Sequence, residues 1–400
     1  MSLEQAARIA DAVLLEGYVL YPYRASSAKN QYRWTFGVLA PKSWSEAGGC
    51  EEWWHEAQAL LAGEPTSLRI QLRFLAIVTR SVEKKDGIRY APVSELKSNG
   101  ELYVPWEEGE LCTIEVDGRR PGVHPFAISA REHLQTIPGG RIVRHRHALK
   151  GAVIVQREAL PTPHGEDSLS RIAIRVENHS AEIPARAPRA LAMRWSYAST
   201  HMLVAAESAR FISLLDPPPH ARDAAAQCQG TRLWTVVSGE EGKDNIAIAS
   251  TLILSDYPQI APESSGDYFD ACEIDEMLAL RTRTLTPDEK VLARATDARS
   301  RAIVERSDAL TAEELARLHG TRRAALVPGV RVTLRPDGHK RRSDAQDLLY
   351  AGRVATVRAV KKDVDGRDFY AVTVDDDPAA ELHVQRGIYR YYYRDELEPA

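Results

Sequence analysis

Residues 170–178 read SRIAIRVEN, and this stretch decides the fold class. The two isoleucines and the valine at positions 172, 174 and 176 share one side of an extended chain, while the charged residues at 171, 175 and 177 lie on the other. Side chains of a strand alternate between the two faces of a sheet. The stretch therefore indicates a half-buried antiparallel strand with one face on a core and one in water.

Similar runs recur from residue 66 to about 260, separated by Gly, Pro and Asp. They include LRIQLRFLAIVTRSV, ELCTIEVD, GRIVRHR, GAVIVQREAL and NIAIASTLILSDYP. Seven or more short strands at this spacing predict a sandwich or an open barrel. Helical spacing of apolar residues predicts helices over 3–15 and 50–62, and the stretch 190–216 is ambiguous between strand and helix.

The composition changes again after residue 265. Residues 272–320 read as helices, with capping boxes at Thr286-Pro-Asp-Glu289 and Thr311-Ala-Glu-Glu314. Residues 325–400 hold four or five short strands, a hairpin signal at Asp365-Gly366 and one long first loop, as in a small SH3-like barrel. We therefore expect an α+β, mainly β protein: a β-rich region over 1–265 (or two subdomains, 1–65 and 66–265), a helical connector over 266–320 and an SH3-like barrel over 325–400.

Charge and composition limit the class of protein. The chain has 400 residues, with 52 Lys and Arg against 56 Asp and Glu, a net charge of −4. So small a net charge argues against a surface that binds nucleic acid or an anionic membrane throughout. The chain has no signal-like start and no apolar run of about 20 residues, and none of its four cysteines forms a C-x-x-C pair. We expect a cytoplasmic protein that does not insert into a membrane.

No common catalytic signature is found: the sequence has no P-loop, no dinucleotide fingerprint, no H-E-x-x-H and no G-x-S-x-G. The densest histidine cluster is Arg144-His145-Arg146-His147, where two imidazoles on one strand face would lie about 6–7 Å apart and could share nickel, iron or zinc. A solvated basic strand is the simpler interpretation. We therefore expect no enzyme and no cofactor, and keep His145 and His147 as candidate metal ligands.

Two segments have the composition of contact surfaces. The first mixes aromatic and basic side chains near the N-terminus, and the second gathers carboxylates before a predicted helix. Their candidate residues are Tyr21, Tyr23, Arg24, Tyr32, Arg33 and Trp34, and Asp267, Asp270, Glu273, Asp275 and Glu276. Aromatic residues and arginine dominate protein interfaces. Ordinary packing of tyrosines at a sheet rim and a normal acidic helix start explain the same residues.

Three stretches resemble proteins encoded in bacterial NiFe-hydrogenase gene clusters, beside hydrogenase subunits, the maturation protease and metal-insertion factors. They are 17–39 (GYVLYPYRASSAKNQYRWTFGVL), 256–285 (DYPQIAPESSGDYFDACEIDEMLALRTRTL) and 343–378 (SDAQDLLYAGRVATVRAVKKDVDGRDFYAVTVDDDP). None of them is a catalytic signature. The resemblance implies a setting, the assembly or support of a NiFe hydrogenase, and no particular reaction.

The first functional hypothesis is a non-enzymatic accessory or assembly factor that binds a NiFe-hydrogenase subunit or maturation protein. The second is a metal-handling or redox factor in the same pathway, using His145, His147 and Cys272. The third is a nucleic-acid-binding module on the C-terminal barrel, where tyrosines 389, 391, 392 and 393 offer stacking surfaces. The near-neutral charge places the third hypothesis last, so nucleic acid is not the expected partner.

Overall fold

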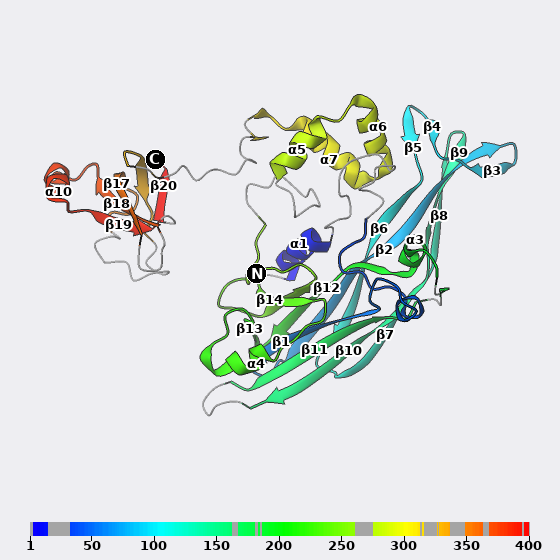
Figure 1. The fold of residues 1–400 in the computed structure, drawn as a ribbon, viewed down its shortest axis with the longest axis horizontal. Helices are drawn as coiled ribbons and strands as arrows, with labels where there is room; N and C mark the ends of the chain where they lie inside the picture. Colours follow the sequence, from blue (N-terminus) through cyan, green and yellow to red (C-terminus); the bar gives the residue numbers. More distant parts are fainter. Residues whose placement is uncertain are drawn as a thin grey trace. The chain divides into compact units, whose positions relative to one another are not determined.

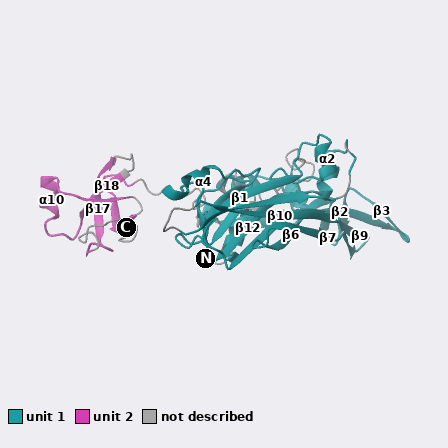
Figure 2. Ribbon diagram, turned by 90° about the horizontal axis from the view of Figure 1, so that it is seen from below, with its two compact units in different colours: residues 1–315 teal, residues 316–400 magenta. Residues whose placement is uncertain are grey.

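A computed structural model of the chain describes residues 3–14, 33–161, 167–180, 183–184, 186–260, 275–312, 314–315, 326, 328–336, 349–362, 368–393 and 396–399. The chain forms two compact units, Met1–Leu315 and Ala316–Ala400 (Figure 2). The described helices expected in a separate connector belong to the first unit.

Two antiparallel sheets build the first unit (Figure 1). Sheet A has eight strands: β2 (Ser67–Asp86), β3 (Arg89–Pro92), β6 (Trp106–Asp117), β8 (Arg131–Ile137), β9 (Gly140–Arg146), β12 (Tyr197–Glu207), β14 (Trp234–Ser238) and β15 (Ile246–Ser250). Sheet B has five, in the order β13 (Arg210–Ile212), β1 (Trp54–Ala62), β11 (Leu169–Asn178), β10 (Leu149–Leu160) and β7 (Gly122–Ile128). The strands β4 (Leu96–Ser98) and β5 (Glu101–Tyr103) pair with each other.

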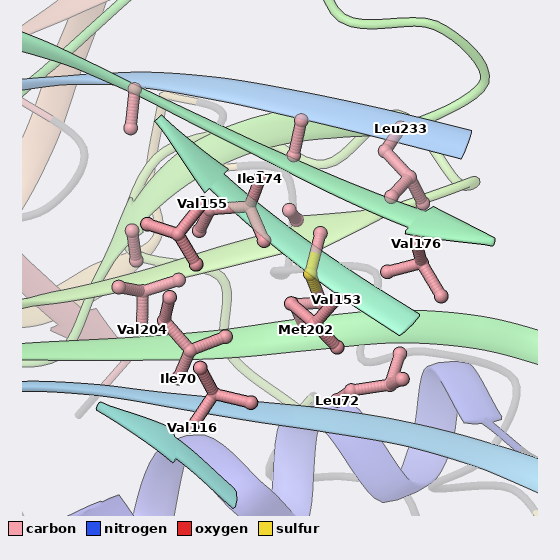
Figure 3. Packing of buried hydrophobic residues seen from close by; sticks show 14 of the residues in the cluster. Ile70, Leu72, Val116, Val153, Val155, Ile174, Val176, Met202, Val204 and Leu233 are labelled. Atoms are coloured by element: carbon pink, nitrogen blue, oxygen red, sulfur yellow. The ribbon is translucent and has the colours of Figure 1, made fainter. Parts of the chain in front are cut away.

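The main core lies between sheets A and B. Alternate residues of β2 and β12, such as Ile70 and Val204, meet alternate residues of β10 and β11, such as Val153 and Ile174 (Figure 3). The predicted face of β11 is confirmed, since its residues 172, 174 and 176 are buried. The mainly β class and the sandwich are thus confirmed, and the described strands form no closed barrel.

The predicted N-terminal helix is α1 (Leu3–Leu14), and it covers the outer face of sheet A. Its Ala6, Ile9 and Ala10 pack on a small apolar cluster of β12, β14 and β15. The buried guanidinium of Arg73 on β2 donates to the carbonyl of Ala7 and binds the carboxylate of Asp11. One ion pair and one apolar stripe therefore hold α1 in place.

The predicted helix over 50–62 is wrong, because residues Trp54–Ala62 form strand β1. Ala57, Ala59 and Leu61 alternate into the core, while Leu60 on the opposite face packs into a second apolar cluster with Ala221 and Ala225. The helix propensity of Ala, Glu and Leu is a weak preference that tertiary packing overrides. The ambiguous stretch 190–216 is mostly strand: β12 and β13 follow the short helices α3 (Arg189–Ala192) and η2 (Met193–Trp195).

Helices form the end of the first unit, as predicted. They are α5 (Asp275–Arg283), α6 (Pro287–Thr296) and α7 (Ala298–Ala309). Three short helices lie earlier in the chain: α2 (Lys42–Glu46), η3 (Pro219–Ala221) and α4 (Arg222–Ala226). Thr286 and Glu289 form the predicted capping box at the start of α6. The reciprocal hydrogen bonds of Thr311 and Glu314 confirm the second box. None of the helices that the described residues form has the length and hydropathy for a bilayer crossing.

The second unit is a five-stranded antiparallel sheet around its own core. Its strands are β16 (Arg331–Leu334), β17 (Val354–Lys362), β18 (Asp368–Val374), β19 (Arg390–Tyr393) and β20 (Leu397–Pro399), with α10 (Ala380–Arg386) before β19. The order β19-β18-β17-β16-β20 places the last strand beside the first. The four or five short strands expected here are thus confirmed, and the SH3-like barrel stays a prediction. The residues of the predicted turn at 365–366 lie outside the described part, but β17 and β18 pair as that hairpin requires.

Candidate functional site

Strand β2 is long enough to extend sheet A beyond the sandwich. It has 20 residues, whereas β10 and β11 have 12 and 10. Along one side, β2 pairs with β12 up to Ala76 and with β9 from Val78 onward; along the other it pairs with β6 and then β3. We call this extension, together with β8 and β9, the arm. Figure 1 shows it running from the sandwich toward β3.

The register of the arm brings basic side chains into adjacent rows. Arg80 on β2 lies opposite Arg144 on β9, which lies opposite His133 on β8. In the next row, Arg146 lies opposite Arg131 on β8. Residues directly opposite in neighbouring strands have side chains on the same face, about 5 Å apart. One face of the arm therefore gathers side chains that are far apart in the sequence.

Two glutamates of β6 bind these arginines. Glu108 accepts from Arg80 at 3.1 Å and from Arg144 at 2.8 Å. Glu110 accepts from Arg131 at 2.8 Å and from Arg146 at 2.7 Å. We call these four arginines and two glutamates the arginine cluster. Four cations over two carboxylates leave an excess of two positive charges.

Arg80 has a structural part within the cluster. Besides Glu108, it donates from Nε and Nη2 to the carbonyl of Val104, and from Nη2 to the carbonyl of Ala295 in the last turn of α6. Burial lowers the pKa of Arg80, although the guanidinium stays charged at neutral pH. Arg80 therefore fastens α6 to the arm and positions Glu108.

Two cavities meet at Arg144. One, of 740 Å³, lies between the arm and the α6–α7 pair, and Arg80, Glu108 and Arg144 are among its lining residues. The other, of 420 Å³, is lined by Val78, Arg131, Glu132, His133, Arg144 and Arg146. The hydrogen bonds found among the described residues use Nε and Nη1 of Arg144 and Nη2 of Arg131. The other N–H groups of these two guanidiniums are available at the smaller cavity.

This arrangement is suited to binding anions. Guanidinium groups offer paired donors that match the two oxygens of a carboxylate or phosphate. Arg131 is 60% exposed and Arg144 28% exposed, so a ligand reaches both without displacing a core residue. Nothing in the cluster resembles a nucleophile held by a base. The chemistry that these side chains support is binding and orientation of a negatively charged group.

The predicted aromatic and basic surface is only partly described. Tyr21, Tyr23, Arg24 and Tyr32 lie outside the described residues. Arg33 and Trp34 are both buried, which agrees with the packing interpretation and leaves no exposed contact surface at these two positions. The Arg33 guanidinium lies 3.7 Å from the centre of the Trp106 ring and donates to the carbonyl of Glu107. These two residues fasten the segment after residue 32 to the start of β6.

The predicted acidic surface also falls mainly outside the described part. Asp267, Asp270 and Glu273 lie there, as does Cys272. Asp275 is the first residue of α5, and Glu276 is half-buried on the same helix. The docking role of this segment stays a prediction.

The two candidate metal ligands are close together. The rings of His145 and His147 meet edge to face with centroids 4.4 Å apart, and His147 stacks on Trp195 at 3.9 Å. Burial, and then the neighbouring His145, lower the pKa of His147. No set of three His, Cys, Asp or Glu side chains suited to a metal ion occurs in the part of the chain that the structure describes. Among the described residues, a metal ion at His145 and His147 would therefore have two imidazole ligands and no third protein ligand.

The arginine cluster is not evident from the sequence alone. In the sequence, Arg144 and Arg146 stand out only as neighbours of the histidines, and no motif marks Arg80, Arg131, Glu108 or Glu110. A weak signal existed, since Glu108 and Glu110, like Arg144 and Arg146, are spaced by two and so share a strand face. Their meeting depends on which strands pair, and the alternation does not encode this.

Comparisons with known proteins add no assignment: a scan against protein-family models gives no match, and a search of curated proteins gives none either.

Proposed function

We propose that the protein is a non-enzymatic accessory factor that binds an acidic segment of a partner polypeptide at the arginine cluster. The observation that carries the proposal is the excess of arginine over glutamate at the 420 Å³ cavity of the arm. The resemblance of three stretches to proteins of NiFe-hydrogenase gene clusters supports a hydrogenase subunit or a maturation protein as the partner.

The charges of the cluster have the placement of a recognition site. Arg131 and Arg144 each share a carboxylate with a more buried arginine, so they are held in position while part of each guanidinium stays accessible. Side chains fixed before binding lose less conformational entropy when a ligand arrives. Charged groups at the rim of an interface mainly accelerate association and make it sensitive to salt.

A direct binding measurement tests the site. Fluorescence anisotropy with a labelled acidic peptide should give binding to the full chain that weakens as salt rises. The double variant Arg131→Gln/Arg144→Gln should weaken it about tenfold or more, in line with the loss of two charge-assisted contacts. A matched control is Arg171→Gln, which removes one cation from an ion pair with Glu158 on sheet B. Equal affinity of the double variant and the wild type would contradict the proposal.

The partner class needs a second experiment. Tagged protein from cells expressing the hydrogenase should retain a hydrogenase subunit or a maturation factor, and the double variant should lose it. Recovery of neither, together with unchanged hydrogenase activity in a deletion strain, would remove the hydrogenase setting and leave the peptide-binding result to stand alone.

One observation favours the nucleic-acid alternative. On the outer face of the second unit, the ring of Phe369 lies 5.4 Å from that of Tyr391 and 6.3 Å from that of Tyr393. The ammonium group of Lys361 lies 5.3 Å from the Tyr391 ring. Residues 316–400 contain 16 Lys and Arg against 13 Asp and Glu, a net charge of +3 in a chain whose total is −4. Aromatic side chains beside cations stack bases of single strands.

This alternative predicts salt-sensitive binding of a labelled single-stranded oligonucleotide. Tyr391→Ala should weaken it several-fold, because stacking contributes about 1–3 kcal/mol per base. Leu382→Ala, at an exposed position of α10, is the matched control. An oligonucleotide that fails to bind at low salt would exclude the alternative.

A further inference from the structure

Strand β8 has one free edge. All seven of its residues pair with β9, from Arg131 opposite Arg146 to Ile137 opposite Gly140, without a register shift. No other strand pairs with β8 among the described residues. Figure 1 shows β8 at the margin of the arm. The backbone groups on its far side are therefore open to another strand.

This edge lacks several of the features that usually block strand addition. The six residues Arg131–Thr136 are exposed on both faces of the sheet. β7, the edge strand of sheet B that precedes it in the chain, carries Pro125, whereas β8 has neither proline nor bulge. Exposed, unbroken edges of this kind are templates for pairing, and proteins commonly protect them with proline, a bulge or charge. On β8, the feature of this kind is charge, from Arg131 and Glu132.

The two faces of β8 differ in character. Arg131, His133 and Gln135 lie on the face of the arginine cluster, where Gln135 accepts from Arg144 at 2.9 Å. On the other face, Leu134 is 51% exposed. A strand added at this edge would lie about 4.8 Å away and place every second side chain beside Arg131 and His133. The intervening side chains would lie near Leu134.

We infer that the partner segment binds by β-augmentation: it adds to the free edge of β8 as an extended strand with acidic residues at alternate positions and apolar residues between them. This inference rests on the proposed function, because the acidic side chains are those that the arginine cluster holds. Main-chain hydrogen bonds to the edge supply affinity in this mode of recognition, and side chains at alternate positions supply selectivity. The occupant is thus a peptide segment in which acidic and apolar residues alternate.

Paired peptides test the geometry without changing the protein. A labelled seven-residue peptide that alternates Glu and Val is compared with a peptide of the same composition in blocks, and the alternating peptide should bind about tenfold more tightly. In an added strand, the N–H groups of every second peptide residue point toward β8 and donate to it. N-methylation of these amides should weaken binding about tenfold or more. N-methylation of the intervening amides, which point away from β8, should change the affinity less than about threefold.

Hydrogen exchange of the full chain gives an independent readout. The alternating peptide should slow amide exchange in residues 131–137 and leave residues 122–128 of β7 unchanged. Binding that needs Arg131 and Arg144 but is the same for both sets of methylated amides and for both sequence orders would overturn the inference while leaving the proposed function intact. Absence of any charge-dependent peptide binding would overturn both. A concentration-dependent doubling of mass in sedimentation, with the same protection of β8, would assign the edge to a second copy and also overturn the inference.

Discussion

Because two of its histidines are buried, we expect the first unit to lose stability in mild acid. His201 on β12 is fully buried, and its Nδ1–H donates to the carbonyl of Ser199 at 2.8 Å, while Nε2 has no partner among the described residues. Burial lowers the pKa of His201 to about 4, with nearby Arg73 acting in the same direction. His55 on β1 is also buried, and burial lowers its pKa to about 4.

The sign of the effect follows from proton binding. The pKa of both imidazoles is about 6.5 in the unfolded chain, so between pH 6.5 and pH 4 the unfolded state binds more protons than the folded state. The free energy of unfolding therefore falls as the pH falls through this window. At pH 5 each imidazole contributes a loss of about 2 kcal/mol relative to pH 8, and the two together about 4 kcal/mol. That is a large part of the stability of an ordinary domain.

Tryptophan fluorescence isolates this effect, because all seven tryptophans lie in the first unit. Urea unfolding between pH 8 and pH 5 gives the free energy of unfolding at each pH. In His201→Asn, which keeps a donor for the Ser199 carbonyl, the loss between pH 8 and pH 5 should be smaller by about 2 kcal/mol than in the wild type. His133→Asn, at the exposed β8 position, should keep the wild-type pH dependence.

The comparison between variants removes the common contribution of carboxylates that titrate near pH 4–5. If His201→Asn loses as much stability on acidification as the wild type does, the burial of that imidazole does not govern the acid response. The reasoning from desolvation would then be refuted.

Three further substitutions, one of them with a control variant, test how the first unit is held together. Arg80→Gln should lower the free energy of unfolding by about 3 kcal/mol, because it removes one of the two cations bound to Glu108 and takes the buried guanidinium donor from two carbonyls. As its control, Arg69→Gln, in an exposed 3.9 Å ion pair, should cost less than about 1 kcal/mol. Asp11→Asn removes the ion pair that holds α1, so amide exchange in residues 3–14 should accelerate about tenfold. Gly37→Ala should lower the melting temperature by several degrees, because residue 37 has φ +55° and a Cβ would lie 2.7 Å from a backbone nitrogen.

Each of these outcomes has a clear opposite. Equal costs for the Arg80 and Arg69 variants would mean that the ties between α6 and the arm do not stabilise the unit. Unchanged exchange in α1 would assign its docking to apolar packing alone. A Gly37 variant with wild-type melting would mean that the segment around residue 37, which contacts the backbone of Thr200 on β12, relaxes without cost.

Local patterns in the sequence predicted most of the elements. The alternation in 170–178 indicated β11 and its buried face, and Thr286 with Glu289 indicated the start of α6. These signals survive without the rest of the molecule because a strand alternates every residue and a cap uses groups three residues apart. The helix predicted over 50–62 failed for the opposite reason, since β11 and the core decide the conformation of β1.

The sequence by itself indicated a mainly β chain built as a sandwich or an open barrel, a set of capped helices and four or five short strands over residues 325–400. Only the tertiary structure decided that Arg80, Arg131, Arg144 and Arg146 share two glutamates, that β8 keeps a free edge, and that Arg33 and Trp34 are buried. The reason is physical: periodicity states which way a side chain points from its own strand, whereas the pairing and register of distant strands decide which side chains it meets.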